Sequence, residues 1–223
     1  MHAVLTIDGP SGAGKGTISQ NVAEALGWHI LDSGSLYRLT ALAASLDQLS
    51  LDDEVSLEKV ALALDVRFEP TDKGLTVYLR NQDVTEDIRE ESIGMKASKI
   101  AAMQGVRAAL LERQRAFEQA PGLVADGRDM GTTVFPDAKL KVFMTASCEE
   151  RAKRRYNQLK QKGISASLPD LVADLKARDE QDANRAVSPL KPADDAIMLD
   201  TTEMTIEQVT SKVLELAKQQ FSI

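Results

Sequence analysis

The chain has 223 residues, with 27 lysines and arginines against 34 aspartates and glutamates, and its formal net charge is −7. This length fits one large domain, and the negative balance excludes proteins that attract nucleic acids or anionic membranes through their overall charge. The single cysteine, Cys148, excludes an intramolecular disulfide, and no apolar run approaches the ~18 residues that span a bilayer, so we expect a cytoplasmic protein,.

Five short apolar runs alternate with helical patterns along the chain. The first run, at residues 4–7, ends before Gly9, and the helical pattern that follows it stops at Gly27,. The other runs lie at residues 28–31, 123–125, 140–144 and 196–199, and the last two are each followed by a capping-box spacing, Ser147 with Glu150 and Thr205 with Gln208,. This alternation predicts an α/β fold, a parallel sheet covered on both faces that binds its ligands at the carboxyl ends of the strands.

Residues 65–90 interrupt this alternation. Apolar and polar residues alternate at 66–68 and again at 75–79, which is the period of half-exposed antiparallel strands,. Residues 71–74 form the predicted hairpin connection, and a short third strand includes Val84. We therefore expect a small antiparallel insertion within one domain, followed by two helical segments at about residues 91–103 and 105–120 that end at Pro121-Gly122.

The segment GPSGAGKGT lies between the first predicted strand and the first predicted helix. Its glycines let backbone N–H groups surround phosphate oxygens, the helix N-terminus adds partial positive charge, and Lys15 would reach the β- and γ-phosphates. This is a P-loop pattern in its expected context, and it predicts binding of a nucleoside triphosphate. Because a glycine follows the lysine, Ser11 and Thr17 both remain candidates for the hydroxyl that approaches Mg²⁺. The predicted ATP-binding residues of the loop are Gly9, Pro10, Ser11, Gly12, Ala13, Gly14, Lys15, Gly16 and Thr17.

Arginines follow the predicted strands at the same edge of the sheet. Arg38 begins the helix behind the second strand, Arg128 follows the third strand, and Arg178 and Arg185 flank a charged stretch before Pro189. Converging guanidinium groups offset the repulsion between two phosphorylated substrates and bind their oxygens bidentately. The arginines therefore indicate a phosphotransferase with an anionic acceptor, and the predicted catalytic residues are Lys15, Arg128, Arg178 and Arg185.

A second concentration of positive charge occupies residues 151–162, which contain no acidic residue. One interpretation is a solvated helix face, and the other is a lid at about residues 151–170 that closes over the triphosphate and excludes water. On the second interpretation Arg154 binds ATP. Asp126 ends the third predicted strand. It is either a turn-forming residue or a residue that holds Mg²⁺ through water, with Thr17 as the other predicted metal-binding residue.

Four segments, together with residues 97–107, resemble the bacterial-type cytidylate kinases of the nucleoside monophosphate kinase family. They are GPSGAGKGT (9–17), LDSGSLYR (31–38), ADGRDMGT (125–132) and RDEQDANRAVSPL (178–190). The resemblance covers essentially the whole chain and implies a P-loop NTPase three-layer fold with a five-stranded parallel sheet, a helical lid and an antiparallel insertion in the monophosphate-binding region. It implies a single kinase domain, residues 1–223, with a core of residues 1–60, 104–150 and 186–223, an insertion at about 61–103 and a lid at about 151–170.

The resemblance further implies transfer of the γ-phosphoryl group of ATP to CMP or dCMP, with Mg²⁺, in pyrimidine nucleotide metabolism. Under this resemblance Arg107, Asp129 and Ser98 would recognise cytosine, whose exocyclic amine donates to a carboxylate where uracil presents a carbonyl. The residues implied to hold the rest of CMP are Ser33, Arg38, Arg128 and Arg185 at the phosphate, and Arg178 and Asp182 near the sugar. The residues by themselves indicate a phosphotransferase on an anionic acceptor, and the choice of cytosine comes from the resemblance.

Two other classes of protein stay open. One is a kinase for another small acceptor such as UMP or AMP, and the other is a P-loop switch or ATPase that acts through a protein or nucleic-acid partner. The chain lacks the N-K-x-D-type motif of a guanine-specific switch, and its net charge disfavours the broad basic face of a DNA-associated ATPase,. We therefore expect ATP and CMP or dCMP as partners, no nucleic-acid polymer and no membrane, and a monomer that closes around its substrates.

Overall fold

The computed structural model describes residues 2–71 and 74–222, so Asp72 and Lys73 of the predicted hairpin connection lie outside the described residues. The chain divides into two compact units. The first unit comprises Met1–Asp32 and Arg115–Ile223, and the second comprises Ser33–Gln114.

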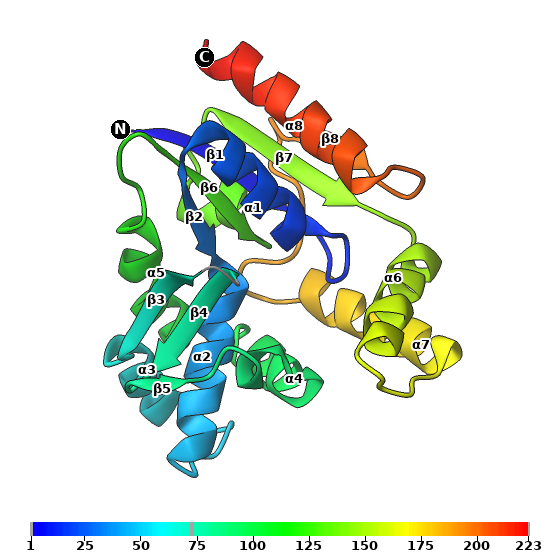
Figure 1. Ribbon diagram of the computed structural model, residues 1–223. Coiled ribbons are helices and arrows are strands. Elements are labelled where there is room, and N and C mark those ends of the chain that lie inside the picture. Colours follow the sequence, from blue (N-terminus) through cyan, green and yellow to red (C-terminus); the bar gives the residue numbers. More distant parts are fainter. Residues whose placement is uncertain (1, 72–73, 223) are drawn as a thin grey trace. The chain divides into compact units, whose positions relative to one another are not determined.

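A five-stranded sheet of order β2-β6-β1-β7-β8 forms the core of the first unit (Figure 1). All neighbouring strands are parallel, so their carboxyl ends lie at one edge of the sheet,. The strands coincide with the five predicted apolar runs, which confirms the α/β class and the parallel sheet. The elements of this unit are β1 (Ala3–Asp8), α1 (Lys15–Leu26), β2 (His29–Asp32), β6 (Gly122–Gly127), the π-helical turn η2 (Met130–Val134), β7 (Leu140–Thr145), α6 (Cys148–Gln161), α7 (Leu168–Ala183), β8 (Ile197–Asp200) and α8 (Ile206–Phe221).

Helices α1 and α8 contact each other and cover one face of this sheet (Figure 1). Ile18 and Val22 of α1 and Val213 of α8 are buried against strand residues that include Leu5 and Val142. Each aliphatic side chain buried in this way stabilises the fold by about 1.5–3 kcal/mol. The cluster therefore fixes the start of α1, and the loop before it, relative to the end of β1.

The start of α8 carries the capping box that the sequence predicts. The Thr205 Oγ1 atom accepts a hydrogen bond from the Gln208 N–H at 3.3 Å, and Gln208 Oε1 accepts one from the Thr205 N–H at 2.9 Å. The Thr205→Ala substitution removes the first bond, and we expect it to lower the free energy of unfolding by about 1 kcal/mol in urea denaturation. The Ser211→Ala substitution, at an exposed position of the same helix, is the control and should change stability by less than about 0.5 kcal/mol. Equal effects of the two substitutions would contradict the capping role.

The second unit combines helices with a three-stranded antiparallel sheet of order β3-β4-β5. This confirms the predicted antiparallel piece. The third strand ends one residue before the predicted Val84, whose N–H nevertheless donates to Val77 O at 2.9 Å. The elements of this unit are α2 (Ser33–Leu46), α3 (Glu54–Leu62), β3 (Val66–Thr71), β4 (Gly74–Leu79), β5 (Gln82–Asp83), the 3₁₀ turn η1 (Asp87–Arg89), α4 (Glu91–Ile100) and α5 (Gln104–Arg115), whose last residue belongs to the first unit.

Helices α4 and α5 both end earlier than the sequence pattern predicts. The second ends at Arg115 instead of near residue 120, because the Glu118 N–H turns back to Arg115 O at 3.0 Å and the chain then leads into β6. Across the part of the chain that the structure describes, no helix has the combination of length and apolar character needed to span a bilayer.

Candidate active site

The loop between β1 and α1 turns tightly at its glycines. Gly12 and Gly14 have φ angles of 77° and 90°, a left-handed region that costs other residues free energy,. A Cβ atom at Gly9 would lie 2.1 Å from Met144 O, so only glycine fits there. Helix α1 begins at Lys15, and no side chain caps its N-terminus. Its first N–H groups can therefore bind phosphate oxygens, as the P-loop pattern predicts.

The Lys15 side chain is buried beside this loop, and its Nζ atom donates to Pro10 O at 2.9 Å. Burial lowers the pKa of Lys15 to about 8, and the nearby Arg128 lowers it too, while carboxylates raise it. The ammonium is therefore charged at neutral pH. Because little water surrounds it, its attraction to a phosphate is stronger than it would be at an exposed position.

This pKa predicts how ATP binding depends on pH. Bound triphosphate favours the charged ammonium, so we expect ATP affinity to be constant below about pH 8 and to fall by up to about tenfold per unit above it, with uptake of a proton on binding,. Calorimetric titrations at several pH values, in buffers of different ionisation enthalpy, measure both quantities. The Lys15→Arg variant keeps the positive charge at every pH used and should lose this dependence. The same dependence in that variant would contradict the assignment to Lys15.

Three carboxylates that interact with Lys15 end neighbouring strands of the sheet. Asp32 and Asp126 stand opposite each other in the register of β2 and β6, and Asp8 ends β1. Burial raises the pKa of Asp126 to about 7 and that of Asp8 to about 6. Because these two pKa values lie near neutral pH, the charge of a metal ion or phosphate bound at this edge of the sheet would change the protonation of Asp8 and Asp126.

The donor groups near Asp126 fit a magnesium ion that arrives with ATP. Among residues 2–71 and 74–222, no group of three or more His, Cys, Asp or Glu side chains could hold a metal ion. Mg²⁺ at phosphate sites binds one or two carboxylates, the substrate phosphates and several waters, so a complete protein cage is not needed. A Cβ atom at Gly16 would lie 3.6 Å from Asp126 Oδ2, so this carboxylate lies next to the turn that carries Thr17.

Three of the predicted arginines converge on one buried carboxylate. The Asp182 Oδ2 atom accepts from Arg128 Nε at 2.9 Å, Oδ1 accepts from Arg185, and Arg178 interacts with the same group electrostatically. Burial by itself raises the pKa of Asp182, but these arginines hold it below its usual value. Three guanidinium groups gathered around one carboxylate concentrate positive charge at this place, which suits an anionic acceptor such as a phosphate monoester,.

Asp129 directly follows Arg128 and immediately precedes the π-helical turn η2. The Asp129 residue is buried, and its carbonyl oxygen accepts from the Thr133 N–H at 2.9 Å. The Asp8 carboxylate accepts from the N–H groups of Met130 and Gly131, each at 2.8 Å, and so fixes the backbone next to Asp129. The sequence reasoning missed Asp8. Its position at the end of the first strand, as Asp32 and Asp126 lie at the ends of theirs, is the signal that could have found it.

The other predicted CMP-binding residues belong to the second unit. Arg107 is 9% exposed, donates to Ala101 O at 3.0 Å and lies over the Tyr37 ring, 5.8 Å from its centroid. These contacts orient the guanidinium of Arg107. The predicted cytosine site draws on residues of both units and stays a prediction. The residues of the second unit are Ser33 and Arg38 on α2, Ser98 on α4 and Arg107 on α5.

Two cations of the basic segment contact the P-loop in this structure. Arg151 is buried and donates to Ser11 O at 2.9 Å. Arg154 donates to Thr201 O at 2.6 Å and to Ala13 O at 3.5 Å. Arg151 is therefore not part of a solvated helix face, whereas Arg154 is partly exposed. The predicted contact of Arg154 with ATP, and the lid itself, stay predictions.

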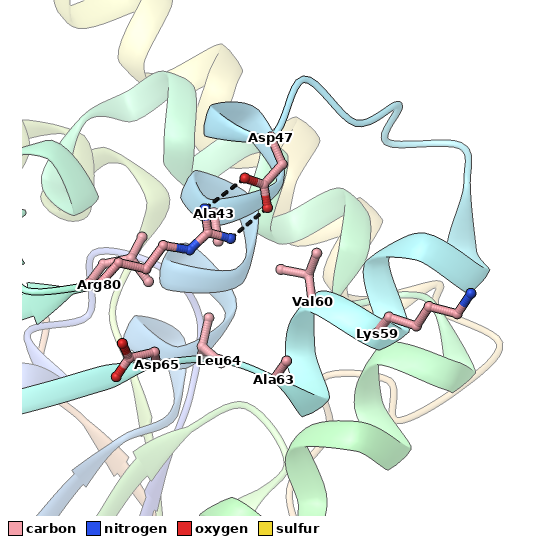
Figure 2. Close-up of a pocket in the computed structure, with 9 residues that line it drawn as sticks. Ala43, Asp47, Lys59, Val60, Ala63, Leu64, Asp65 and Arg80 are labelled. Carbon is pink, nitrogen blue, oxygen red and sulfur yellow. Dashed lines mark hydrogen bonds and ion pairs between the residues drawn. The ribbon is translucent and has the colours of Figure 1, made fainter.

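A separate hollow of about 220 Å³ lies within the second unit (Figure 2). Arg80 and Asp47, which both line it, form two hydrogen bonds of 2.6 and 2.5 Å. None of the predicted ATP- or CMP-binding residues lines this hollow.

Comparison with known proteins places the chain in one family. The family model described as cytidylate kinase matches residues 5–219. The cytidylate kinase of Aeromonas salmonicida (strain A449) is 55% identical over 220 residues, which cover 99% of this chain and 96% of that protein. The cytidylate kinase of Pseudomonas syringae pv. tomato is 58% identical over 213 residues, 95% of this chain and 93% of that protein. The matches include the P-loop, the arginine cluster and the antiparallel insertion, and the chain belongs to the cytidylate kinase family.

Proposed function

We propose that this protein transfers the γ-phosphoryl group of ATP to CMP or dCMP, giving ADP and CDP or dCDP. The observation that carries the proposal is that one unit holds both a P-loop with a buried lysine and a cluster of three arginines around Asp182. The first suits a triphosphate donor and the second suits an anionic acceptor. Membership of the cytidylate kinase family supports cytosine as the base of that acceptor.

The proposed mechanism is direct in-line transfer without a covalent enzyme intermediate. Residues 9–17 bind the triphosphate, and Lys15 stabilises charge on the transferring group. Arg128 and Arg185, together with Ser33 and Arg38, hold the acceptor phosphate, whose attacking oxygen is already ionised at neutral pH, so no general base is needed. Catalysis then rests on positioning and electrostatics. Mg²⁺ bound with ATP would supply positive charge to the β- and γ-phosphate oxygens, with Thr17 and, through water, Asp126 as its protein partners.

In this reaction the cytosine base is recognised by Asp129, Arg107 and Ser98. The Asp129 carboxylate accepts from the exocyclic amine of cytosine, and Arg107 donates to the N3 and O2 atoms of the base. Arg178 and Asp182, near the sugar, complete the CMP site. Residues at about 61–103 form the monophosphate-binding insertion and those at about 151–170 the lid, in which Arg154 binds ATP. Residues 1–60, 104–150 and 186–223 form the core of a monomeric, cytoplasmic enzyme.

A coupled assay of ADP production tests this proposal. ATP is supplied with no acceptor, CMP, dCMP, UMP or AMP, and we expect rapid ADP formation only with CMP and dCMP. ADP formation of equal rate in every mixture would reject the kinase in favour of an ATPase. A clear preference for UMP or AMP would keep the phosphotransferase and reject cytosine as its base.

A further inference from the structure

We infer that Arg151 is a positioning residue of the P-loop. It holds the Ser11 carbonyl oxygen on the side of the loop away from the phosphate site, so that the N–H group of Gly12 faces the phosphates. The inference rests on the proposed function, because it concerns how the ATP site of that reaction is kept in its binding conformation. It assigns Arg151 a task other than contact with the substrate.

The hydrogen bonds of Arg151 are made to the protein itself. Its side chain is 4% exposed. Nε donates to Ala146 O at 3.0 Å, and Nη1 donates to Ser11 O at 2.9 Å and to Asp179 Oδ1 at 3.0 Å. Nη2 donates to the other oxygen of the same Asp179 carboxylate. These bonds use four of the five N–H donors of a guanidinium group. They join Arg151 to the end of β7, to the P-loop and to α7.

The bond to Ser11 O determines where the following N–H group points. The peptide bond between Ser11 and Gly12 is trans, and a planar trans peptide directs its C=O and N–H in opposite directions. A guanidinium that holds the Ser11 oxygen on one side therefore turns the Gly12 N–H to the other side. In a P-loop that other side is the phosphate site.

Packing strengthens this restraint. A Cβ atom at Gly12 would lie 3.3 Å from Arg151 Cβ, so the loop backbone lies directly against the stem of this arginine. The bidentate pair with Asp179 fixes the plane of the guanidinium, which a single ammonium could not reproduce. Arg154 adds a weaker contact of the same kind through Ala13 O, at 3.5 Å.

The alternative role, a lid cation that binds ATP directly, predicts the opposite effect of one substitution. If Asp179 serves to orient Arg151, the Asp179→Asn variant loosens the guanidinium and weakens ATP binding. If Arg151 instead contacts ATP, loss of the competing carboxylate frees it and leaves ATP binding equal or tighter. The sign of this change separates the two roles.

The experiment compares Arg151→Lys, Asp179→Asn and a matched control, Lys176→Met. Lys176 pairs with Glu149 at 3.6 Å across the same two helices, but both of these side chains are exposed. Calorimetry with ATP alone gives the dissociation constant, and steady-state kinetics give kcat and the KM values for ATP and CMP. We expect both test variants to bind ATP about tenfold or more weakly, the loss associated with a hydrogen bond to a charged group. The Arg151→Lys variant should keep the KM for CMP within about twofold, and Lys176→Met should match the unmodified protein in every value.

The outcomes separate a positioning role from a structural one. A merely structural Arg151 would lower the melting temperature and the active fraction without changing ATP affinity in the protein that remains folded, and that result would overturn the inference. Unchanged or tighter ATP binding by Asp179→Asn would overturn it too, even if Arg151→Lys did not fold. Failure of the proposed function would give a different result: the unmodified protein would show no CMP-dependent turnover.

Discussion

Replacing Arg185 by alanine is expected to lower kcat for phosphorylation of CMP by about 10³-fold or more, the range seen when an arginine that stabilises a transferring phosphoryl group is lost. The Arg185 side chain is 5% exposed and shares the Asp182 carboxylate with Arg128. In the variant, Arg128 still pairs with Asp182, so the carboxylate keeps a partner and we expect the fold to persist. The acceptor phosphate, however, loses one of the two guanidinium groups bonded to Asp182. Steady-state kinetics measure the loss, and circular dichroism checks the fold.

The Arg80→Ala variant is the control for this prediction. Arg80 is also paired with an aspartate, Asp47, but its side chain is 48% exposed and it belongs to the second unit. Its activity should stay within about twofold of the unmodified protein, as expected of an exposed ion pair. A folded Arg185→Ala variant with nearly normal kcat would remove Arg185 from the acceptor site.

Replacing Asp129 by asparagine is expected to reduce the preference for CMP over UMP, expressed as a ratio of kcat/KM values, by about 10- to 100-fold, in line with about 1–3 kcal/mol for a base-specific contact. A carboxylate only accepts hydrogen bonds and so pairs with the amine of cytosine, whereas an amide can also donate to the carbonyl of uracil. The substitution changes one buried group without changing its size, so the turn that follows should persist. Kinetics with both nucleotides give the ratio.

The matched control for Asp129 is Asp137→Asn, at an exposed position shortly after the same turn. It makes the same chemical change at a residue that has no assigned role in base recognition, and the CMP-to-UMP ratio should stay as it was. An unchanged ratio in the Asp129→Asn variant would show that cytosine is recognised by other groups.

The strands of the large sheet could be predicted because buried parallel strands appear in a sequence as short apolar runs. Their order could not be predicted, since β6 lies between β1 and β2 through pairings between residues about 90 to 120 positions apart. The capping box at Thr205 was predictable for a different reason: both of its partners lie within four residues.

The candidate site likewise has parts that could be predicted from the sequence and parts that could not. The P-loop was predictable because its glycines, lysine and helix are contiguous. The hydrogen bonds of Asp8 to Met130 and Gly131 join residues more than 120 positions apart, and no local pattern indicates them. The basic segment was visible as composition, but packing decides which of its cations is buried. Arg151 reaches Ser11 across 140 positions, so its contact with the P-loop emerged only from the structure.

The fate of the γ-phosphoryl group tests the central claim most directly. ATP that carries a radioactive γ-phosphate is incubated with the protein and CMP, and the products are separated by chromatography. Direct transfer predicts that the label appears in CDP, one for each ADP formed, and that almost none appears as inorganic phosphate. Label released as inorganic phosphate at the same rate with and without CMP would contradict the assignment of this protein as a nucleoside monophosphate kinase.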